Sequence, residues 1–232
     1  MKTLGLIGGM SWESTAIYYR RLNQIARERL GGLHSAKLVL LSLDFAEIET
    51  LQAAQDWSGA GARMADAARA LERAGADALL ICTNTMHKLV PEVREASSLP
   101  LLHIADATAD AMRAARVSRP LLLATRYTME QDFYTGRLVE RGFEVRVPDE
   151  EGRTVVHGVI YDELCAGRFE PSSKRACLKI VEAHCESDDI DSVIFGCTEI
   201  GMLLSPDDIG VPAFDTTELH ARAAMDFALR TD

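Results

Sequence analysis

Two short segments of the chain share a pattern that could support acid–base chemistry. Residues 81 to 87 read Ile-Cys-Thr-Asn-Thr-Met-His, and residues 194 to 200 read Ile-Phe-Gly-Cys-Thr-Glu-Ile. Each segment follows an apolar run that begins with an aspartate, and a shift of 114 positions places Thr83 on Cys197. Because a thiol has an ordinary pKa of about 8.5, it can serve as thiolate or thiol near neutral pH. The pattern therefore predicts a paired site with a hydroxyl in one segment and a thiol in the other.

Such a pair suits proton transfer at a carbon next to a carboxylate. Removing a proton from one face and returning one to the opposite face inverts the carbon, and this requires two opposed acid–base groups but no cofactor. The intermediate carries negative charge that backbone amides and hydroxyl or amide side chains can stabilise. Side chains of this type stand at predicted strand ends: Asn84, Thr85, Thr125, Thr128 and Thr198.

These side chains need elements that bring them together, and the hydrophobic pattern predicts an α/β fold. Apolar runs typical of strands cover residues 3–8, 37–43, 77–82, 100–104, 120–125, 143–147, 191–196 and 212–214. Amphipathic stretches typical of helices cover residues 13–30, 58–74, 88–96, 105–116, 130–141, 157–166, 171–186 and 217–229. This alternation predicts mostly parallel sheets flanked by helices. In such sheets ligands bind beyond the strand ends, where the candidate side chains lie.

An internal repeat divides the predicted elements into two lobes. A shift of 117 places Leu4-Gly-Leu-Ile on Leu121-Leu-Leu-Ala, and a shift of 112 places Pro100-Leu-Leu-His on Pro212-Ala-Phe-Asp. Short apolar strands also resemble each other by chance, so coincidence is the competing interpretation. We expect a first lobe of residues 1–98 plus 208–232 and a second lobe of residues 99–207. The pseudo-symmetric lobes would form a cleft with Thr83 on one wall and Cys197 on the other.

The composition favours a soluble protein with a small-molecule partner. The chain has 232 residues, a net charge of −10 and a pI of about 5.1, and it shows no basic stripe. These features disfavour binding to nucleic acid or to an anionic membrane. The N-terminus lacks a signal-peptide pattern and no apolar run approaches the length of a membrane span, so we expect a cytoplasmic protein. Five cysteines without metal-type spacing favour reduced thiols over disulfides or a metal site.

Four motifs resemble the cofactor-independent aspartate/glutamate racemase family, which includes broad-specificity amino-acid racemases. They are Leu6-Ile-Gly-Gly-Met-Ser, Thr83-Asn-Thr-Met-His, Leu123-Ala-Thr-Arg-Tyr-Thr-Met and Gly196-Cys-Thr-Glu, and the resemblance covers nearly the whole chain. It implies two pseudo-symmetric α/β lobes, an active site in the cleft between them and a homodimer. It also implies an amino-acid substrate held between opposed acid–base residues, with no cofactor and no metal.

The first of the two acid–base positions departs from the pattern of many members, which have cysteine at both. Here Thr83 takes that position, as it does in a subgroup of the family, and Cys82 comes one residue early. Because successive side chains of a strand point to opposite faces, Cys82 should point away from the side that Thr83 takes. The resemblance implies that Cys197 is the base toward the L-enantiomer, while Thr83, or a water that it orients, delivers a proton to the opposite face.

Several other residues acquire roles from the resemblance. Met10 and Ser11 follow Gly8-Gly9 and would contact the substrate, although the residues alone are equally consistent with a tight strand-to-helix turn. Tyr127 lies within the third motif and would also line the site. Glu199 stands where related glutamate racemases have a histidine, so it is either a partner in proton transfer or a charge at a helix start. A carboxylate beside the thiol would raise the pKa of Cys197.

An acidic substrate side chain would require a cation. Arg168 follows a Glu-Leu-x-x-Gly segment and is the best candidate, with a solvent-exposed arginine as the alternative. Gln52 lies in a loop where some dedicated aspartate racemases have an arginine, and it could hydrogen-bond the substrate instead. Its presence leaves a broader amino-acid range open. We interpret His87 first as a partner for nearby backbone and second as a functional residue.

Two rival functions remain at this point. Arylmalonate-type decarboxylases also keep only the thiol of the second lobe, and they would require an apolar pocket without a cation. A non-catalytic amino-acid-binding protein would bind its ligand without exchanging the proton on the α-carbon.

Overall fold

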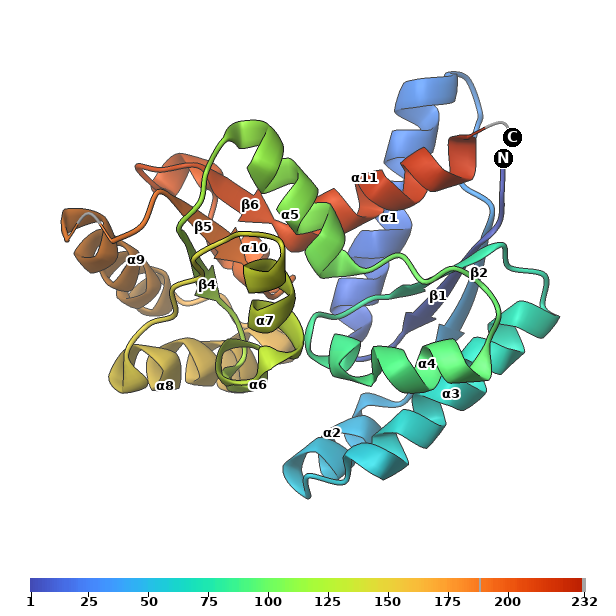
Figure 1. The fold of residues 1–232 in the computed structure, drawn as a ribbon, viewed down its shortest axis with the longest axis horizontal. Helices are drawn as coiled ribbons and strands as arrows, with labels where there is room; N and C mark the ends of the chain where they lie inside the picture. The colour runs from blue at the N-terminus through green and yellow to red at the C-terminus, as the bar shows by residue number, and fades with distance from the viewer. Residues whose placement is uncertain (188, 231–232) are drawn as a thin grey trace. The chain divides into compact units, whose positions relative to one another are not determined.

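The computed structural model describes residues 1–187 and 189–230, which form two compact units. The first unit comprises Met1–Ile104 together with the C-terminal segment from His220, and the second comprises Ala105–Leu219. The chain passes between the units within helices α5 (Ile104–Ala115) and α11 (Thr216–Leu229). Both units consist of a parallel sheet flanked by helices (Figure 1), which confirms the predicted fold class.

The first unit contains a parallel sheet with the strand order β2-β1-β3. Its strands are β1 (Leu4–Gly8), β2 (Leu38–Ser42) and β3 (Ala78–Ile81). Its other elements are α1 (Trp12–Leu30), α2 (Phe45–Ala53), α3 (Trp57–Arg73), η1 (Thr85–Leu89) and α4 (Val90–Ala96). Beyond β3, the backbone at Leu101 makes an isolated parallel bridge to Leu79.

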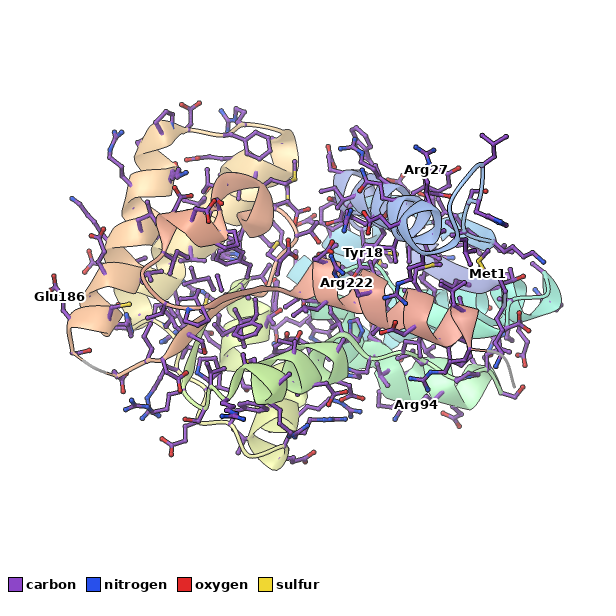
Figure 2. The ribbon with its side chains drawn as sticks, turned by 90° about the horizontal axis from the view of Figure 1, so that it is seen from above. Met1, Tyr18, Arg27, Arg94, Glu186 and Arg222 are labelled. Carbon is purple, nitrogen blue, oxygen red and sulfur yellow. The ribbon has the colours of Figure 1, made fainter. Side chains whose placement is uncertain are left out.

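The sheet of the first unit is buried on both faces because alternate residues of each strand enter different cores. Leu4 and Leu6 pack against α1 and the end of α11, in a cluster that includes Tyr18 and Met225. Figure 2 shows Tyr18 on α1, the helix that packs beside α11. Ile7 instead enters a cluster formed with α2, α3, η1 and α4. The strand ends are thereby fixed between two layers of helices.

The second unit contains a parallel sheet with the strand order β4-β5-β6. Its strands are β4 (Pro120–Leu123), β5 (Ser192–Phe195) and β6 (Ala213–Asp215). Its other elements, besides parts of α5 and α11, are α6 (Arg126–Glu130), α7 (Asp132–Glu140), α8 (Glu150–Gly158), η2 (Val159–Glu163), η3 (Leu164–Ala166), α9 (Pro171–Glu186), α10 (Ile200–Leu203) and η4 (Pro206–Asp208). Arg146 makes an isolated parallel bridge to Leu121 on the outer side of β4.

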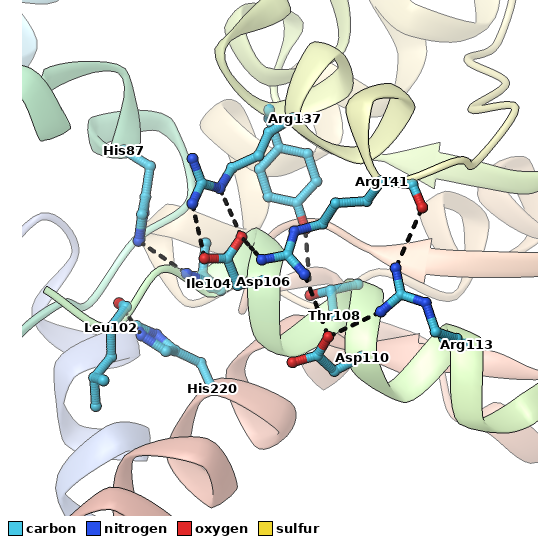
Figure 3. A network of polar contacts seen from close by, with 11 residues as sticks. His87, Leu102, Ile104, Asp106, Thr108, Asp110, Arg113, Arg137, Arg141 and His220 are labelled. Atoms are coloured by element: carbon cyan, nitrogen blue, oxygen red, sulfur yellow. Dashed lines mark hydrogen bonds and ion pairs between the residues drawn. The ribbon is translucent and has the colours of Figure 1, made fainter.

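An ion-pair network joins α5 to α7 in the second unit (Figure 3). Arg137 binds Asp106 through two hydrogen bonds of 2.7 and 2.8 Å, and Arg141 bridges Asp106 and Asp110 at 2.9 and 3.3 Å. The Arg137 and Arg141 guanidinium groups lower the pKa of the Asp106 carboxyl despite its partial burial. A bidentate pair of this kind fixes one helix against the other more firmly than a single contact would.

The internal repeat is visible in the topology of the two units. With the isolated bridges included, the orders are β2-β1-β3-Leu101 and Arg146-β4-β5-β6. Leu79 pairs with Leu101 as Val193 pairs with Ala213, at shifts of 114 and 112 positions. Leu4 pairs with Ala78 as Pro120 pairs with Ser192, at shifts of 116 and 114. The register of the first strand therefore differs by one residue from the shift of 117 that the sequence suggested.

The structure places the boundaries of the units elsewhere than after residues 98 and 207. The Leu79 N–H donates to the Pro100 carbonyl, and the Leu79 carbonyl accepts from the Leu102 N–H, so this segment belongs to the first sheet. Likewise β6 pairs with β5, so residues 208–219 belong to the second unit and not to the first. Residues 231 and 232, which we expected to belong to the first lobe, lie outside the described part of the chain.

Several predicted elements also differ from the structure. The expected strands at 100–104 and 143–147 are reduced to single bridges, at Leu101 and Arg146. In the first of them Pro100 lacks an N–H and Ile104 already begins α5. A helix that was not predicted, α2, begins at an Asp44 cap that accepts a hydrogen bond from the Ala46 N–H. The helix expected at 157–166 begins instead at Glu150, after the Asp149 cap, and continues as the irregular turns η2 and η3.

Candidate active site

Each unit leaves one residue partly exposed just beyond a buried strand. Among residues 81–87, after β3, only Thr83 is not buried, and among residues 192–200, at the end of β5, only Cys197 is not buried. These two positions are the ones that the shift of 114 places on each other. Because their neighbours are packed inside the protein, the exposure is local to the hydroxyl-bearing and thiol-bearing residues. Both units therefore have one partly exposed residue, a threonine in one and a cysteine in the other, at the same point of the fold.

The end of β5 is shaped by a glycine before the thiol. A Cβ atom on Gly196 would come within 2.5 Å of Leu122 Cδ1 and within 2.9 Å of Ala124 Cβ, so a larger residue does not fit. The chain then turns, and the Cys197 thiol donates a hydrogen bond of 2.8 Å to Glu199 Oε2. Glu199 is only 4% exposed and is also the N-cap residue of α10, so it is a buried acceptor that stands at a helix start.

The surroundings of Cys197 favour the protonated thiol in the ligand-free protein. Burial of the sulfur raises the pKa of Cys197 well above its usual range, and the Glu199 carboxylate and the nearby Cys165 raise it further. This agrees with the effect expected of a carboxylate beside a thiol. Thiolate formation consequently requires an acceptor for the proton or the arrival of a positive charge.

Buried threonine hydroxyls lie close to the end of β5 and the end of β4. Thr198 and Thr217 share a hydrogen bond of 2.8 Å between their hydroxyls, and Thr125 and Thr128 share one of 3.2 Å. The Thr216 hydroxyl donates to the Phe195 carbonyl at 2.9 Å and so ties α11 to β5. Sequence reasoning missed Thr217, although its place two residues after β6 was a signal that could have found it.

Three aromatic side chains, those of Tyr127, His157 and Tyr161, lie together near Thr125. Tyr127 meets the His157 ring edge-on at 6.2 Å between centroids, and the Tyr161 ring lies tilted by 45° to His157 at 4.6 Å. The Arg126 N–H donates to His157 Nδ1 at 3.3 Å. Burial lowers the pKa of His157, and the Arg126 charge lowers it further. Sequence reasoning missed His157 because it had to be linked to the Thr125 segment across an intervening helix.

The end of β3 presents Thr83 between buried neighbours. Cys82 is 1% exposed and packs with α1 and α11, as the alternation of the strand predicted. Burial raises the pKa of the Cys82 thiol far above its usual range, which excludes it as a base near neutral pH. Asn84 and Thr85 are also buried, at the start of η1. Thr83 is therefore the one partly exposed residue between the buried residues 81–82 and 84–87.

The glycine-rich turn after β1 has the geometry of a tight strand-to-helix connection. Gly9 has φ of +90°, and its N–H donates to Thr15 Oγ1 at 2.8 Å. Ser11 caps α1, because its hydroxyl accepts the Ser14 N–H at 3.2 Å. Met10 is buried in the core beneath the turn. These contacts account for the shape of the turn in structural terms, so substrate contact by Met10 and Ser11 remains a prediction.

The two residues proposed to recognise a substrate side chain are held by the protein itself. Gln52 is 3% exposed and donates its amide N–H to Met86 Sδ at 3.0 Å. Arg168 is exposed, and its guanidinium hydrogen-bonds the nearby Asp162 carbonyl.

Among the described residues, no helix has the length and apolarity needed to span a membrane.

Comparison with known proteins gives this arrangement a family. The sequence pattern of the Asp/Glu/hydantoin racemases matches residues 7–224. A crystal structure from Yersinia pestis assigned to the Asp/Glu racemases has 51% identity and a TM-score of 0.92, covering 99% of this chain and 100% of that one. An aspartate racemase homologue from Pyrococcus horikoshii OT3 has 35% identity and a TM-score of 0.87 over the same shares. The broad specificity amino-acid racemase RacX of Bacillus subtilis (strain 168) is 25% identical over 162 residues, 69% of this chain and 68% of that protein. The chain belongs to the Asp/Glu/hydantoin racemase family.

Proposed function

We propose that this protein is a cofactor-independent amino-acid racemase that uses Cys197 and Thr83 on opposite faces of the α-carbon. The observation that carries the proposal is the matched exposure of these two residues at equivalent strand ends. A protein that only bound amino acids would have no need for a thiol paired with a buried carboxylate. The expected setting is a homodimer in the cytoplasm.

The reaction begins on the side of Cys197. The thiol proton passes to the Glu199 carboxylate, to which it already donates a hydrogen bond, and leaves a thiolate. The positively charged ammonium group of the substrate favours that thiolate by its charge. The thiolate then takes the α-proton of the L-enantiomer, and the electron pair of the broken C–H bond moves into the substrate carboxylate as an enediolate.

The reaction ends on the side of Thr83. Its hydroxyl, or a water that it orients, gives a proton to the opposite face of the carbon and takes one back from solvent. Glu199 releases to solvent the proton that it received from the thiol, which restores the starting state. A threonine alkoxide is very unfavourable, so in the return direction the base at rest is a neutral hydroxyl. A neutral hydroxyl is a weaker base than the thiolate. The two faces are therefore kinetically unequal, although the 1:1 equilibrium of the enantiomers is unchanged.

Stabilisation of the enediolate falls to donors near the two strand ends. In this proposal the second unit contributes the hydroxyls of Thr198, Thr125 and Thr128 as donors to the enediolate. The first unit contributes Asn84 and Thr85. Met10, Ser11 and Tyr127 complete the lining in this proposal.

Two residues, Arg168 and Gln52, are the candidates for recognising the side chain of the substrate. Arg168 would pair with a carboxylate if it released the Asp162 carbonyl. Gln52 would offer an amide if it released the Met86 sulfur, which is a weak acceptor. Aspartate and glutamate are therefore the first substrates to test, within a wider range of amino acids.

A panel of L- and D-amino acids in deuterium oxide tests the proposal directly. NMR follows the loss of the α-proton signal, and chiral chromatography follows inversion. The proposal predicts both for at least one amino acid. Release of carbon dioxide from a disubstituted malonate without any amino-acid exchange would instead select the decarboxylase, and binding without exchange would select the binding protein.

A further inference from the structure

We propose that His87 is a positioning residue that sets the direction of the Thr83 hydroxyl by holding the Thr83 backbone. This inference rests on the proposed racemase function, because it assigns a role within the same reaction. It is carried by two hydrogen bonds of the imidazole, by the burial of the ring and by the absence of an equivalent residue in the second unit.

Both nitrogens of the imidazole form hydrogen bonds, and together these determine its tautomer; Figure 3 shows the one to Ile104. His87 Nε2 lies 3.2 Å from the Ile104 N–H, which can only donate. His87 Nδ1 lies 2.8 Å from the Thr83 carbonyl oxygen, which can only accept. A neutral imidazole has one donor and one acceptor nitrogen, so Nδ1 carries the proton and Nε2 accepts. The ring thus ties Thr83 to Ile104, the residue at which the chain leaves the first unit.

The surroundings of the ring maintain this neutral form. His87 is 2% exposed and packs against His103 and His220, with ring centroids 4.6 and 5.8 Å apart. Burial lowers the pKa of His87 well below its usual range, and His103 and His220 lower it further. A protonated ring would have two donors and would lose the bond from Ile104.

His220 is fixed in the same way and completes the cluster. Its Nδ1 accepts the Tyr18 hydroxyl at 2.8 Å, and its Nε2 donates to the Leu102 carbonyl at 2.8 Å. It is the residue at which the chain returns to the first unit. Its two ring nitrogens bind Tyr18 and Leu102, whereas a ring nitrogen of His87 binds the Thr83 carbonyl, which makes His220 a matched control.

Thr83 needs such a support because the sheet ends before it. The bond from the Cys82 N–H to the Ile7 carbonyl, at 2.9 Å, is the last ladder contact at this end of β3. The Thr83 carbonyl lies beyond the ladder and accepts from His87 instead. Because threonine is β-branched, its hydroxyl direction follows closely from its backbone. A displacement of about 1 Å at a reacting group can lower a rate by about 10²-fold.

The second unit lacks this support at the equivalent place. The position four residues after Cys197 is Gly201, where a Cβ atom would come within 2.8 Å of Asp215 Oδ2. The Cys197 carbonyl accepts the Ile200 N–H at 3.1 Å, so a backbone contact suffices there. The imidazole is therefore specific to the unit that uses a hydroxyl.

The test compares two substitutions that each keep one of the two hydrogen bonds. His87→Asn keeps a donor at the place of Nδ1, and His87→Gln keeps an acceptor at the place of Nε2. Each variant is incubated in deuterium oxide with an L-amino acid that the wild type racemises. NMR follows deuterium entering the recovered L-form, which reports on Cys197, and chiral chromatography follows the D-form, which also requires Thr83. Thermal melting shows that each variant is folded.

We expect His87→Gln to lower formation of the D-form by about 10- to 100-fold, because the Thr83 carbonyl loses its donor. Deuterium entry into the L-form should change by less than about 3-fold, and His87→Asn should lose less than about 5-fold in D-form production. His220→Gln should keep the wild-type ratio of exchange to inversion. Equal effects of His87→Gln on exchange and inversion, or of the Asn and Gln variants on inversion, would overturn the inference.

A measurement on the wild type alone tests the tautomer. Histidine labelled with ¹⁵N should show a protonated Nδ1 and an unprotonated Nε2 at His87, and the reverse assignment would overturn the inference without affecting the proposed function. A wild type that exchanges no amino acid would contradict the proposed function, and the role of His87 with it.

Discussion

The end of β3 and the end of β5 occupy the same place in their units but hold their reactive groups differently. Thr83 has its backbone carbonyl bound by a neutral, buried histidine, whereas Cys197 has its thiol bound by a buried carboxylate. Under the proposed function, the first arrangement sets the direction of a hydroxyl and the second accepts the proton of a thiol. The two units would then supply two acid–base groups of unlike strength, each with the support that its chemistry requires.

The largest effect is expected from removing the thiol. Cys197→Ala should lower both deuterium exchange and inversion of the L-substrate by about 10³-fold or more, because the base is lost. Cys185→Ala, at another partly exposed cysteine of the second unit, should retain wild-type activity. NMR of the α-proton in deuterium oxide measures both variants. Wild-type exchange in Cys197→Ala would remove the thiol from the account.

A smaller and two-sided effect is expected from Glu199→Gln. Removing the carboxylate charge should lower the pKa of Cys197, so alkylation of this thiol by iodoacetamide should begin at lower pH. Inversion should nevertheless fall by about 10- to 100-fold, because the acceptor of the thiol proton is lost. Peptide mass spectrometry measures alkylation, with Cys185 as an internal control whose profile should stay the same. An unchanged Cys197 profile would show that Glu199 does not raise this pKa.

The close packing around Gly196 at the end of β5 can be tested by measuring the free energy of unfolding. Gly196→Ala should lower the free energy of unfolding by about 1–3 kcal/mol, because the added methyl group overlaps Leu122 and Ala124. Gly210→Ala, where an added Cβ meets nothing within 4 Å, should change the same quantity by less than about 0.5 kcal/mol. Urea unfolding measures both. Equal stabilities of the two variants would contradict the close packing of this turn.

The smallest effect is expected from the histidine at the β3 end. Because the folded-state pKa of His87 lies below its unfolded value of about 6.5, the unfolded chain binds more protons below that pH. The free energy of unfolding should therefore fall as the pH drops below about 6.5, with a slope from this group of at most about 1.4 kcal/mol per pH unit. Urea unfolding between pH 7 and pH 5 measures it. His87→Asn should show a smaller slope, and an equal slope would contradict a neutral, buried ring.

The sequence pattern predicted the parts of the fold that depend on local periodicity. The alternation of strands and helices predicted the two parallel sheets, and the strand alternation at Cys82 predicted which side chain enters the core. The repeat predicted the correspondence of the strands, with an offset of one residue at β1, but the expected boundary at residue 208 assigned β6 to the first lobe, whereas it pairs with β5 in the second unit. Contacts that join distant segments were not predictable, since no local pattern links His87 to Ile104 or Thr198 to Thr217.

The most direct test of the account is the partition between exchange and inversion in Thr83→Ala, with Thr83→Ser as the variant that keeps the hydroxyl. Starting from the L-enantiomer in deuterium oxide, Thr83→Ala should still place deuterium in the recovered L-form through Cys197. Its formation of the D-form should fall by about 10²-fold or more, because the proton donor to the opposite face is lost. Formation of the D-form at the wild-type rate by Thr83→Ala would contradict the pairing of the two strand ends.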